Sequence, residues 1–227
     1  MNTPRAITID GPAGSGKSTL GASLAAALGF VYFDTGVMYR ALTLAVLDAD
    51  LDPNDGTAVA ACAERIDIGV QPPTVADCRQ YTITLDGRDV TWDIREQRVE
   101  RAVSTAAGHP AVRVILRAQQ RAIGMRGNVV MVGRDIGSIV LPEAPLKIYL
   151  DVSIAERTRR RSAELVGRGD SVDEHALYDS IANRDARDAH VMQPAPDAVH
   201  INGDTQSPAD TLAYVLSLVP TGMRSHP

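Results

Sequence analysis

One short loop constrains the fold of this 227-residue chain more than any other feature. Its sequence, Gly-Pro-Ala-Gly-Ser-Gly-Lys-Ser, runs from Gly11 to Ser18 and places two glycines around four residues, followed by a lysine and a serine. A β-prone run over residues 5–10 precedes the loop, and a helical pattern over residues 18–28 follows it. This order of strand, glycine-rich loop and helix matches the phosphate-binding P-loop, for which the context matters as much as the spacing.

The loop predicts a binding site for a nucleoside triphosphate. Its glycines allow backbone N–H groups to surround a phosphate, and the helix N-terminus adds partial positive charge. We expect Lys17 to reach the β- and γ-phosphates and the Ser18 hydroxyl to bind Mg²⁺, so that Mg²⁺ with ATP as phosphoryl donor is the predicted cofactor. The predicted ATP-binding residues are Gly11, Pro12, Ala13, Gly14, Ser15, Gly16, Lys17, Ser18 and Thr19. The motif does not indicate what accepts the phosphoryl group.

Strand-like and helix-like segments alternate along most of the chain. Further short apolar runs typical of buried strands cover residues 30–33, 129–132, 146–150 and 198–201, and helical patterns cover residues 34–50, 94–108 and 110–124. Between residues 66 and 93 the pattern changes to short alternating runs around a tight turn at Asp86-Gly87. We therefore predict an α/β fold with a doubly wound, five-stranded parallel sheet of P-loop type and a small inserted β unit, with ligands at the carboxyl ends of the strands.

Charge and composition argue against several classes of protein. A net charge of −5 and a pI near 5.5 argue against nonspecific nucleic-acid binding, which requires a basic surface. No run of 18 apolar residues predicts a membrane span. With two cysteines and no signal-peptide pattern, we expect a cytoplasmic protein with reduced thiols. Lys17 and Lys147 are the only lysines, which fits either a compositional bias toward arginine or a need for bidentate phosphate contacts.

The residues at the strand ends favour a kinase among P-loop proteins. The chain lacks the Asn-Lys-x-Asp tetrapeptide that a guanine-specific GTPase carries, which argues against that class. The sequence does not exclude a motor ATPase. Arg40 follows the second predicted strand, and Arg134 and Asp135 follow the third. In a parallel sheet these positions lie beside the P-loop, where arginines can form a second anion site or surface ion pairs. Two such arginines at adjacent strand ends favour an acceptor phosphate.

Four segments resemble the bacterial cytidylate kinases of the nucleoside monophosphate kinase group, and the resemblance extends from Thr3 to about Pro220. The segments cover residues 9–18, 34–40 (Asp-Thr-Gly-Val-Met-Tyr-Arg), 133–137 (Gly-Arg-Asp-Ile-Gly) and 183–188 (Asn-Arg-Asp-Ala-Arg-Asp). The second and third are far more specific than the P-loop. The resemblance implies ATP-dependent phosphorylation of CMP and dCMP, with ATP and these monophosphates as the partners. We also expect a monomer.

The resemblance also implies roles for individual residues. Asp135, Ser104 and Arg113 would read the cytosine edge, Arg40 and Arg134 would hold the monophosphate, and Arg184 and Asp188 would contact the sugar. The implied catalytic residues are Lys17, Arg40, Arg134, Arg157 and Arg161. The implied substrate-binding residues are Asp34, Thr35, Tyr39, Arg40, Arg95, Ser104, Arg113, Arg134, Asp135, Arg184 and Asp188.

The resemblance further divides the chain into parts. Residues 1–65, 94–155 and 170–220 would form the core P-loop domain, and residues 66–93 the inserted monophosphate-binding domain. Residues 156–169, which carry a dense arginine cluster, would form a lid over the triphosphate, and residues 221–227 a tail. A solvated helix end is the alternative interpretation of the arginine cluster.

The chain departs from the family pattern at Val191, where the family usually places an arginine. One cation on the acceptor side is therefore missing. Arg187 can cover the loss, or the monophosphate binds more weakly, or the acceptor differs. Two alternatives to a CMP kinase follow: a P-loop kinase of UMP or another small acceptor, and a nucleotide-binding protein without transfer activity.

Overall fold

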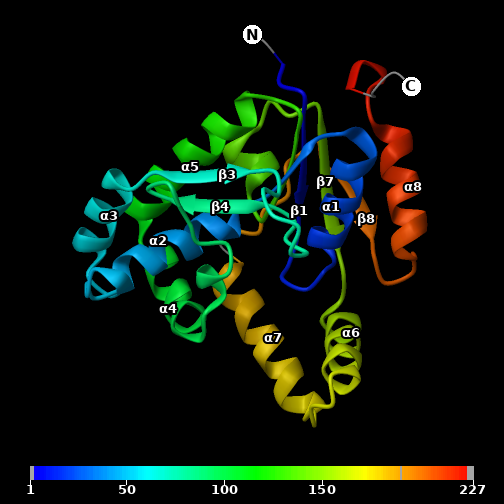
Figure 1. Cartoon of the computed structure of the whole chain (residues 1–227). Coiled ribbons are helices and arrows are strands. Elements are labelled where there is room, and N and C mark those ends of the chain that lie inside the picture. The colour runs from blue at the N-terminus through cyan, green and yellow to red at the C-terminus, as the bar shows by residue number, and fades with distance from the viewer. Residues whose placement is uncertain (1–2, 190, 224–227) are drawn as a thin grey trace.

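A five-stranded parallel sheet forms the centre of the molecule (Figure 1). The structure, a computed structural model, describes residues 3–189 and 191–223. The strands are β1 (Ala6–Asp10), β2 (Val31–Asp34), β6 (Val129–Gly133), β7 (Leu146–Asp151) and β8 (Val199–Asn202), in the order β2-β6-β1-β7-β8. The predicted α/β fold with five parallel strands is confirmed.

Helices cover both faces of this sheet. Helix α1 (Lys17–Leu28) packs on one face, where a Cβ added at Gly21 would lie 2.6 Å from Cγ2 of Val132. Helix α5 (Pro110–Met125) packs on the other, where a Cβ added at Gly124 would lie 2.8 Å from Sδ of Met131. Successive strand residues point to opposite faces, so these two contacts place α1 and α5 on opposite sides of β6. Helix α8 (Pro208–Leu218) lies beside α1 (Figure 1).

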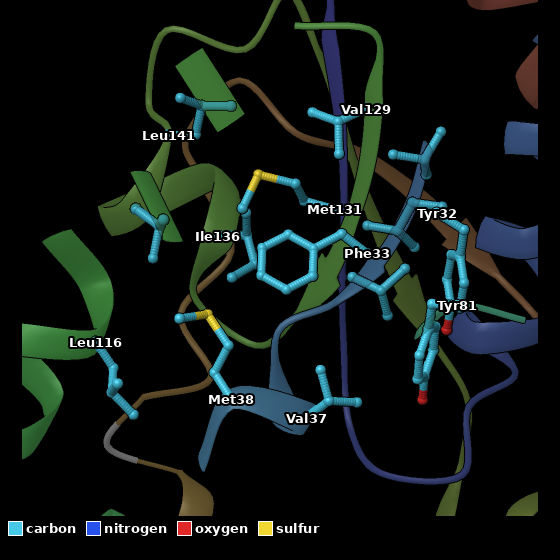
Figure 2. Close-up of a cluster of buried hydrophobic side chains, with 14 of the residues drawn as sticks. Tyr32, Phe33, Val37, Met38, Tyr81, Leu116, Val129, Met131, Ile136 and Leu141 are labelled. Atoms are coloured by element: carbon cyan, nitrogen blue, oxygen red, sulfur yellow. The ribbon is translucent and has the colours of Figure 1, made fainter. Parts of the chain in front are cut away.

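The main core lies between the sheet and the helices that follow β2 and β6. Figure 2 shows Phe33 surrounded by Met38, Met131 and Ile136, all of which are buried. In the parallel register Asp10 of β1 pairs with Gly133 of β6, so the two strands end together. The loops that follow β1, β2 and β6 consequently leave the sheet along one edge.

A second, antiparallel sheet shares no strand with the first. It contains β3 (Ile68–Gln71), β4 (Thr82–Leu85) and the short β5 (Arg88–Asp89). Near it lie α2 (Gly36–Asp48), α3 (Gly56–Arg65), a 3-10 helix (Asp93–Arg95) and α4 (Gln97–Gly108). Helix α3 has no counterpart among the predicted elements.

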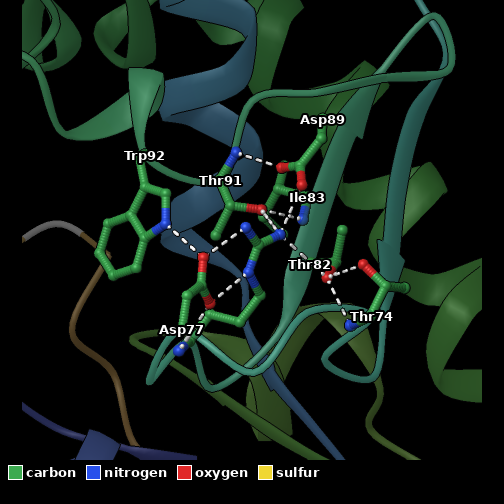
Figure 3. Close-up of polar contacts among 8 residues, drawn as sticks. Thr74, Asp77, Thr82, Ile83, Asp89, Thr91 and Trp92 are labelled. Atoms are coloured by element: carbon green, nitrogen blue, oxygen red, sulfur yellow. Dashed lines mark hydrogen bonds and ion pairs between the residues drawn. The ribbon is translucent and has the colours of Figure 1, made fainter.

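Polar contacts fix the loop between β3 and β4. The Arg79 guanidinium donates to Asp77 at 2.6–2.7 Å and to Asp89 at 2.5 Å. The Trp92 indole donates to Asp77 at 2.8 Å (Figure 3). The Thr91 hydroxyl accepts from the backbone N–H of Ile83 at 2.9 Å. These contacts hold the chain just before the 3-10 helix against the small sheet.

Two helices extend from the carboxyl edge of the central sheet (Figure 1). They are α6 (Ile154–Gly167) and α7 (Glu174–Asp188), and an ion pair between Arg157 and Asp185 joins them. A π-helix (Ile136–Val140) follows β6, and a 3-10 helix (Thr221–Met223) ends the described chain, so residues 224–227 of the predicted tail lie outside it. Within residues 3–189 and 191–223, no helix combines the length and apolarity needed to cross a membrane.

Candidate active site

The P-loop depends on glycines at three positions. Gly11, Gly14 and Gly16 have φ values of 148°, 78° and 94°, which residues with a Cβ rarely adopt. A Cβ at Gly11 would also lie 2.3 Å from the backbone oxygen of Leu150. The loop is therefore built from backbone that no side chain obstructs, as a phosphate site requires.

Lys17 lies in the interior of the loop. Its Nζ donates to the Pro12 carbonyl oxygen at 2.5 Å and lies 3.4 Å from the Ser15 hydroxyl oxygen. Burial, and after it the positive charge of Arg134, lower the pKa of Lys17 to about 8. The ammonium group is thus held where it can exchange these weak partners for phosphate oxygens.

The Ser18 side chain lies close enough to the hydroxyl of Tyr32 on β2 to act on its pKa. Burial raises the pKa of Tyr32, so this phenol stays neutral. Within the described residues no three carboxylate, histidine or cysteine side chains gather as a metal cluster. Mg²⁺ bound together with phosphates usually takes only one or two protein ligands, so a single serine hydroxyl at this position fits such an ion.

Asp10 connects the P-loop to the turn after β6. Its two carboxylate oxygens accept hydrogen bonds from the backbone N–H groups of Ile136 and Gly137 at 2.9 and 2.8 Å. Burial raises the pKa of Asp10 to about 6, although these two hydrogen bonds oppose the shift. The carboxylate fixes the segment that carries Arg134 and Asp135. Sequence reasoning assigned Asp10 no role, because its partners are backbone groups far along the chain.

Asp34, a half-buried carboxylate at the end of β2, interacts electrostatically with residues of both the donor and the acceptor sides of the site. Burial raises the pKa of Asp34, while Lys17, Arg40 and Arg134 each act to lower it. One Asp34 oxygen also accepts from the Gly36 N–H at 3.0 Å. The lysine of the P-loop and the two arginines predicted to hold a monophosphate therefore share one electrostatic environment.

The predicted acceptor arginines are paired with carboxylates of the same chain. Arg40 forms an ion pair with Glu100 of α4 and donates to the Ile94 carbonyl oxygen at 3.3 Å. Arg134 forms an ion pair with Asp188 of α7. Arg184 lies one turn before Asp188, with its Nε 4.0 Å from an Asp188 oxygen, as their spacing predicts. An incoming phosphate would have to replace these carboxylates.

Part of the predicted base-reading group lies together. Arg113 of α5 donates to Asp135 at 3.0 Å, and its guanidinium lies 5.6 Å from the centre of the Tyr39 ring. The Thr35 hydroxyl donates to the Val132 carbonyl oxygen at 2.9 Å and so joins the ends of β2 and β6.

Two other predicted acceptor residues lie apart from that group. Ser104 is exposed on α4, and no hydrogen bond joins it to another predicted acceptor residue in the described chain. Arg95 lies over the Trp92 ring at 4.9 Å and near the Tyr81 hydroxyl at 3.5 Å.

The two predicted lid arginines differ in their environment. Arg157 is buried and donates to the carbonyl oxygens of Val152 and Ala13, each at 3.0 Å, which links α6 to the P-loop. Arg161 is about half exposed and donates to Glu164 of its own helix at 2.6 Å. Of these two arginines, Arg157 is the one that contacts the P-loop in the described structure.

A cavity of about 560 Å³ lies beside the P-loop, and some of the residues that line it were not predicted from the sequence. The loop after β8, from Gly203 to Pro208, lines it together with Arg159 and Arg160. Arg160 donates to the Gly203 carbonyl oxygen at 2.5 Å. In the sequence, only the turn-forming residues that follow β8 indicated a loop at positions 203–208, and nothing indicated that this loop lines a cavity.

Val191, the departure from the family pattern, is buried beyond the end of α7. Its backbone N–H donates to the Asp188 carbonyl oxygen at 2.9 Å. Arg187 is exposed and donates to the Asn183 carbonyl oxygen of its own helix at 3.3 Å. An arginine at position 191 would therefore need room in the core, and Arg187 lies against its own helix rather than against the other acceptor residues.

The fold has known counterparts among solved structures. A shikimate kinase from Bacteroides thetaiotaomicron superimposes with a TM-score of 0.51 at 14% identity, covering 94% of this chain and 97% of that one. Together with the P-loop between β1 and α1, this defines the fold class as a P-loop α/β fold.

Sequence comparisons define the family within this class. The family model described as Cytidylate kinase matches residues 7–221. A cytidylate kinase from Roseiflexus castenholzii is 56% identical over 220 residues, covering 96% of this chain and 95% of the relative. Another, from Chloroflexus aggregans, is 55% identical over 217 residues, covering 96% of this chain and 94% of the relative. The chain belongs to the cytidylate kinase family.

Proposed function

We propose that the protein transfers the γ-phosphoryl group of ATP to CMP and dCMP and releases the diphosphates. One observation carries the proposal: Lys17 of the P-loop and the arginines Arg40 and Arg134 all lie close enough to the half-buried Asp34 carboxylate to act on its pKa. A donor triphosphate at the loop and an acceptor phosphate at the arginines would meet there. The family membership supports CMP as the acceptor.

The chemistry at this site rests on positioning and charge neutralisation. The phosphate of a nucleoside monophosphate is largely ionised near pH 7, so its oxygen can attack in line without a strong general base. Lys17, Arg40 and Arg134 would stabilise the charge on the transferring group. Mg²⁺ held by the Ser18 hydroxyl and the phosphates would neutralise further charge when bound.

The remaining acceptor residues would recognise base and sugar. Asp135 would accept a hydrogen bond from the exocyclic amino group that cytosine has and uracil lacks. Arg113 and Ser104 would complete the contact with the base, while Arg184 and Asp188 would contact the sugar. Asp34, Thr35, Tyr39 and Arg95 would form the walls of the pocket.

The parts of the chain would share these tasks. We assign monophosphate binding to the inserted unit of residues 66–93 and the role of lid to residues 156–169, with the remainder of residues 1–220 as the core. Arg157 already contacts the P-loop, and Arg161 would have to leave Glu164 to act on the phosphates. Lid closure would exclude water and suppress ATP hydrolysis. The cavity lined by residues 203–208 would hold the ATP base.

The test follows the labelled γ-phosphate of ATP. With CMP present, the label should appear in CDP, and the Lys17→Met variant should lose this transfer. Label released only as inorganic phosphate would indicate an ATPase. When other nucleoside monophosphates are offered as well, label in the diphosphate of one of these instead of in CDP would indicate a different acceptor. Tight ATP binding with no transfer at all would favour a nucleotide-binding protein. Each of these three outcomes contradicts the proposal.

A further inference from the structure

A second arginine of α5, Arg117, contacts the residue proposed to read the base. Its Nη2 lies 2.5 Å from Oδ2 of Asp135, and Nη2 of Arg113, one turn earlier, lies 3.0 Å from the same oxygen. The Asp135 side chain is 8% exposed, so both pairs lie largely out of water, where charge-assisted hydrogen bonds are strong.

The two arginines differ in what else they contact. Arg113 also lies over the ring of Tyr39, a predicted wall of the acceptor pocket. In the described part of the chain, each guanidinium hydrogen-bonds with Asp135 alone, and each has a buried Nε without a partner. The contact with Tyr39 therefore distinguishes them: Arg113 is also directed toward the pocket, whereas the only contact that the structure describes for the Arg117 guanidinium is with the carboxylate.

We infer that Arg117 is a positioning residue that holds the Asp135 carboxylate in place while Arg113 turns to the base. The inference rests on the proposed function. Both arginines occupy Oδ2, and Oδ1 accepts no hydrogen bond from the described residues. Oδ1 is thus left available for an exocyclic amino group.

The surrounding charges explain why a second cation is needed. Asp10 of β1 lies close enough to Asp135 for their negative charges to interact unfavourably. If Arg113 rotated toward a ligand without Arg117 present, Asp135 would remain buried beside another carboxylate with no cation bonded to it. A buried carboxylate in that state rotates or takes up a proton. A protonated acid could donate to the O4 atom of uracil, and discrimination between CMP and UMP would decrease.

The test compares Arg117→Gln with Arg117→Lys. Loss of one charge-assisted hydrogen bond corresponds to roughly a ten- to hundredfold decrease in affinity. We expect Arg117→Gln to lower the CMP to UMP ratio of kcat/KM by about tenfold, chiefly through a higher KM for CMP, with the KM for ATP unchanged. Arg117→Lys keeps the positive charge and should restore most of the ratio.

Arg121 offers a matched control on the same helix. It contacts Glu143 and the Val140 carbonyl oxygen in the segment after Asp135, but not Asp135 itself, so Arg121→Gln should leave the ratio unchanged. Circular dichroism and thermal unfolding would establish that each variant is folded.

Three outcomes would overturn the inference. The first is a CMP to UMP ratio of kcat/KM that is unchanged in folded Arg117→Gln. The second is a ratio that falls equally in Arg117→Lys and Arg117→Gln. The third is a ratio that falls as much in Arg121→Gln as in Arg117→Gln. If Arg117→Gln does not fold, Arg117→Lys alone decides. A CMP to UMP ratio close to that of the wild type supports the positioning role of the positive charge, and a strongly lowered ratio contradicts this role. Absence of CMP phosphorylation by the wild type would instead contradict the proposed function.

Discussion

Carboxylates of this chain hold three of the arginines proposed to bind phosphate. Glu100 pairs with Arg40, Asp188 with Arg134, and Asp185 with Arg157. Each pair keeps a guanidinium in a fixed place before any nucleotide arrives. Each pair also competes with the nucleotide, because phosphate and carboxylate bind the same donors.

Glu100→Gln should strengthen CMP binding. The Glu100 side chain is 55% exposed, so its pair with Arg40 is worth only about 0.2–1 kcal/mol, and the dissociation constant of CMP should fall by about 1.5- to 5-fold. Calorimetric titration with CMP measures this. Glu96→Gln, which removes a partner of Arg98 instead of Arg40, is the matched control. Weaker CMP binding in Glu100→Gln would show that Glu100 supports the site rather than competing for it.

ATP binding should weaken as the pH rises above about 8. The pKa of Lys17 lies near 8 instead of its ordinary 10.5, so the free protein loses this positive charge as the pH passes 8. Phosphates favour the charged form, so ATP binding above that pH must take up a proton, and the affinity should fall by up to about tenfold per pH unit. Titration calorimetry between pH 7 and about 9.5 in buffers of different ionisation enthalpy measures both effects.

Lys17→Met is the control for this pH dependence. The variant should bind ATP more weakly at pH 7 and show little change of affinity between pH 7 and about 9.5. The same pH dependence in the variant would assign it to another group.

At the residue level the sequence indicated candidate charged side chains for the site, but not the partners that they have in the structure. Lys17, Arg40 and Arg134 follow strands or loops that a local pattern identifies. Glu100 lies 60 positions from Arg40, so only the packing of α4 against α2 brings the two together. Arg117 was missed for a similar reason, since its surface-like spacing on α5 does not indicate that it contacts a carboxylate after β6.

At the level of elements, α1 packs on the sheet through a glycine. A Cβ at Gly21 would lie 2.6 Å from Val132 and 3.0 Å from Tyr32. Gly21→Ala should therefore lower the free energy of unfolding by about 1–3 kcal/mol, even though alanine favours a helix. The urea midpoint measures the change.

Gly167→Ala is the matched control for the packing of α1. Gly167 lies in the last turn of α6, and an added Cβ there meets nothing within 4 Å. Alanine should be neutral or stabilising by up to about 1 kcal/mol at this position. A Gly21→Ala protein as stable as the wild type would show that α1 can move away from the sheet without cost.

Strong local patterns predicted most of the elements. The five strands of the central sheet coincide with short, mostly apolar runs, and α5 begins with Pro110 in its first turn. Helix α3 was missed, although Asp55 accepts from the N–H groups of Thr57 and Ala58 as an N-cap. The π-helix after β6 could not be predicted, because the carboxylate that fixes its first N–H groups belongs to Asp10, 126 positions earlier.

At the level of the whole molecule, Trp92 can report on the inserted unit. It is the only tryptophan, is 46% exposed, and lies beside Arg95. If Arg95 contacts the acceptor, CMP should change the tryptophan emission, whereas ATP alone should change it little. Stopped-flow or steady-state fluorescence measures this. An equal response to ATP, or none to saturating CMP, would contradict the placement of the acceptor beside this unit.

The central claim is that the central sheet brings an ATP loop and a cytosine-reading acceptor site together. The most direct test is a coupled assay of ADP formation that yields kcat/KM for each nucleoside monophosphate and for ATP without an acceptor. We predict rapid turnover with CMP and dCMP, much slower turnover with UMP, and almost none without an acceptor. Folded protein that forms ADP equally well with and without CMP, or prefers UMP, would contradict the account.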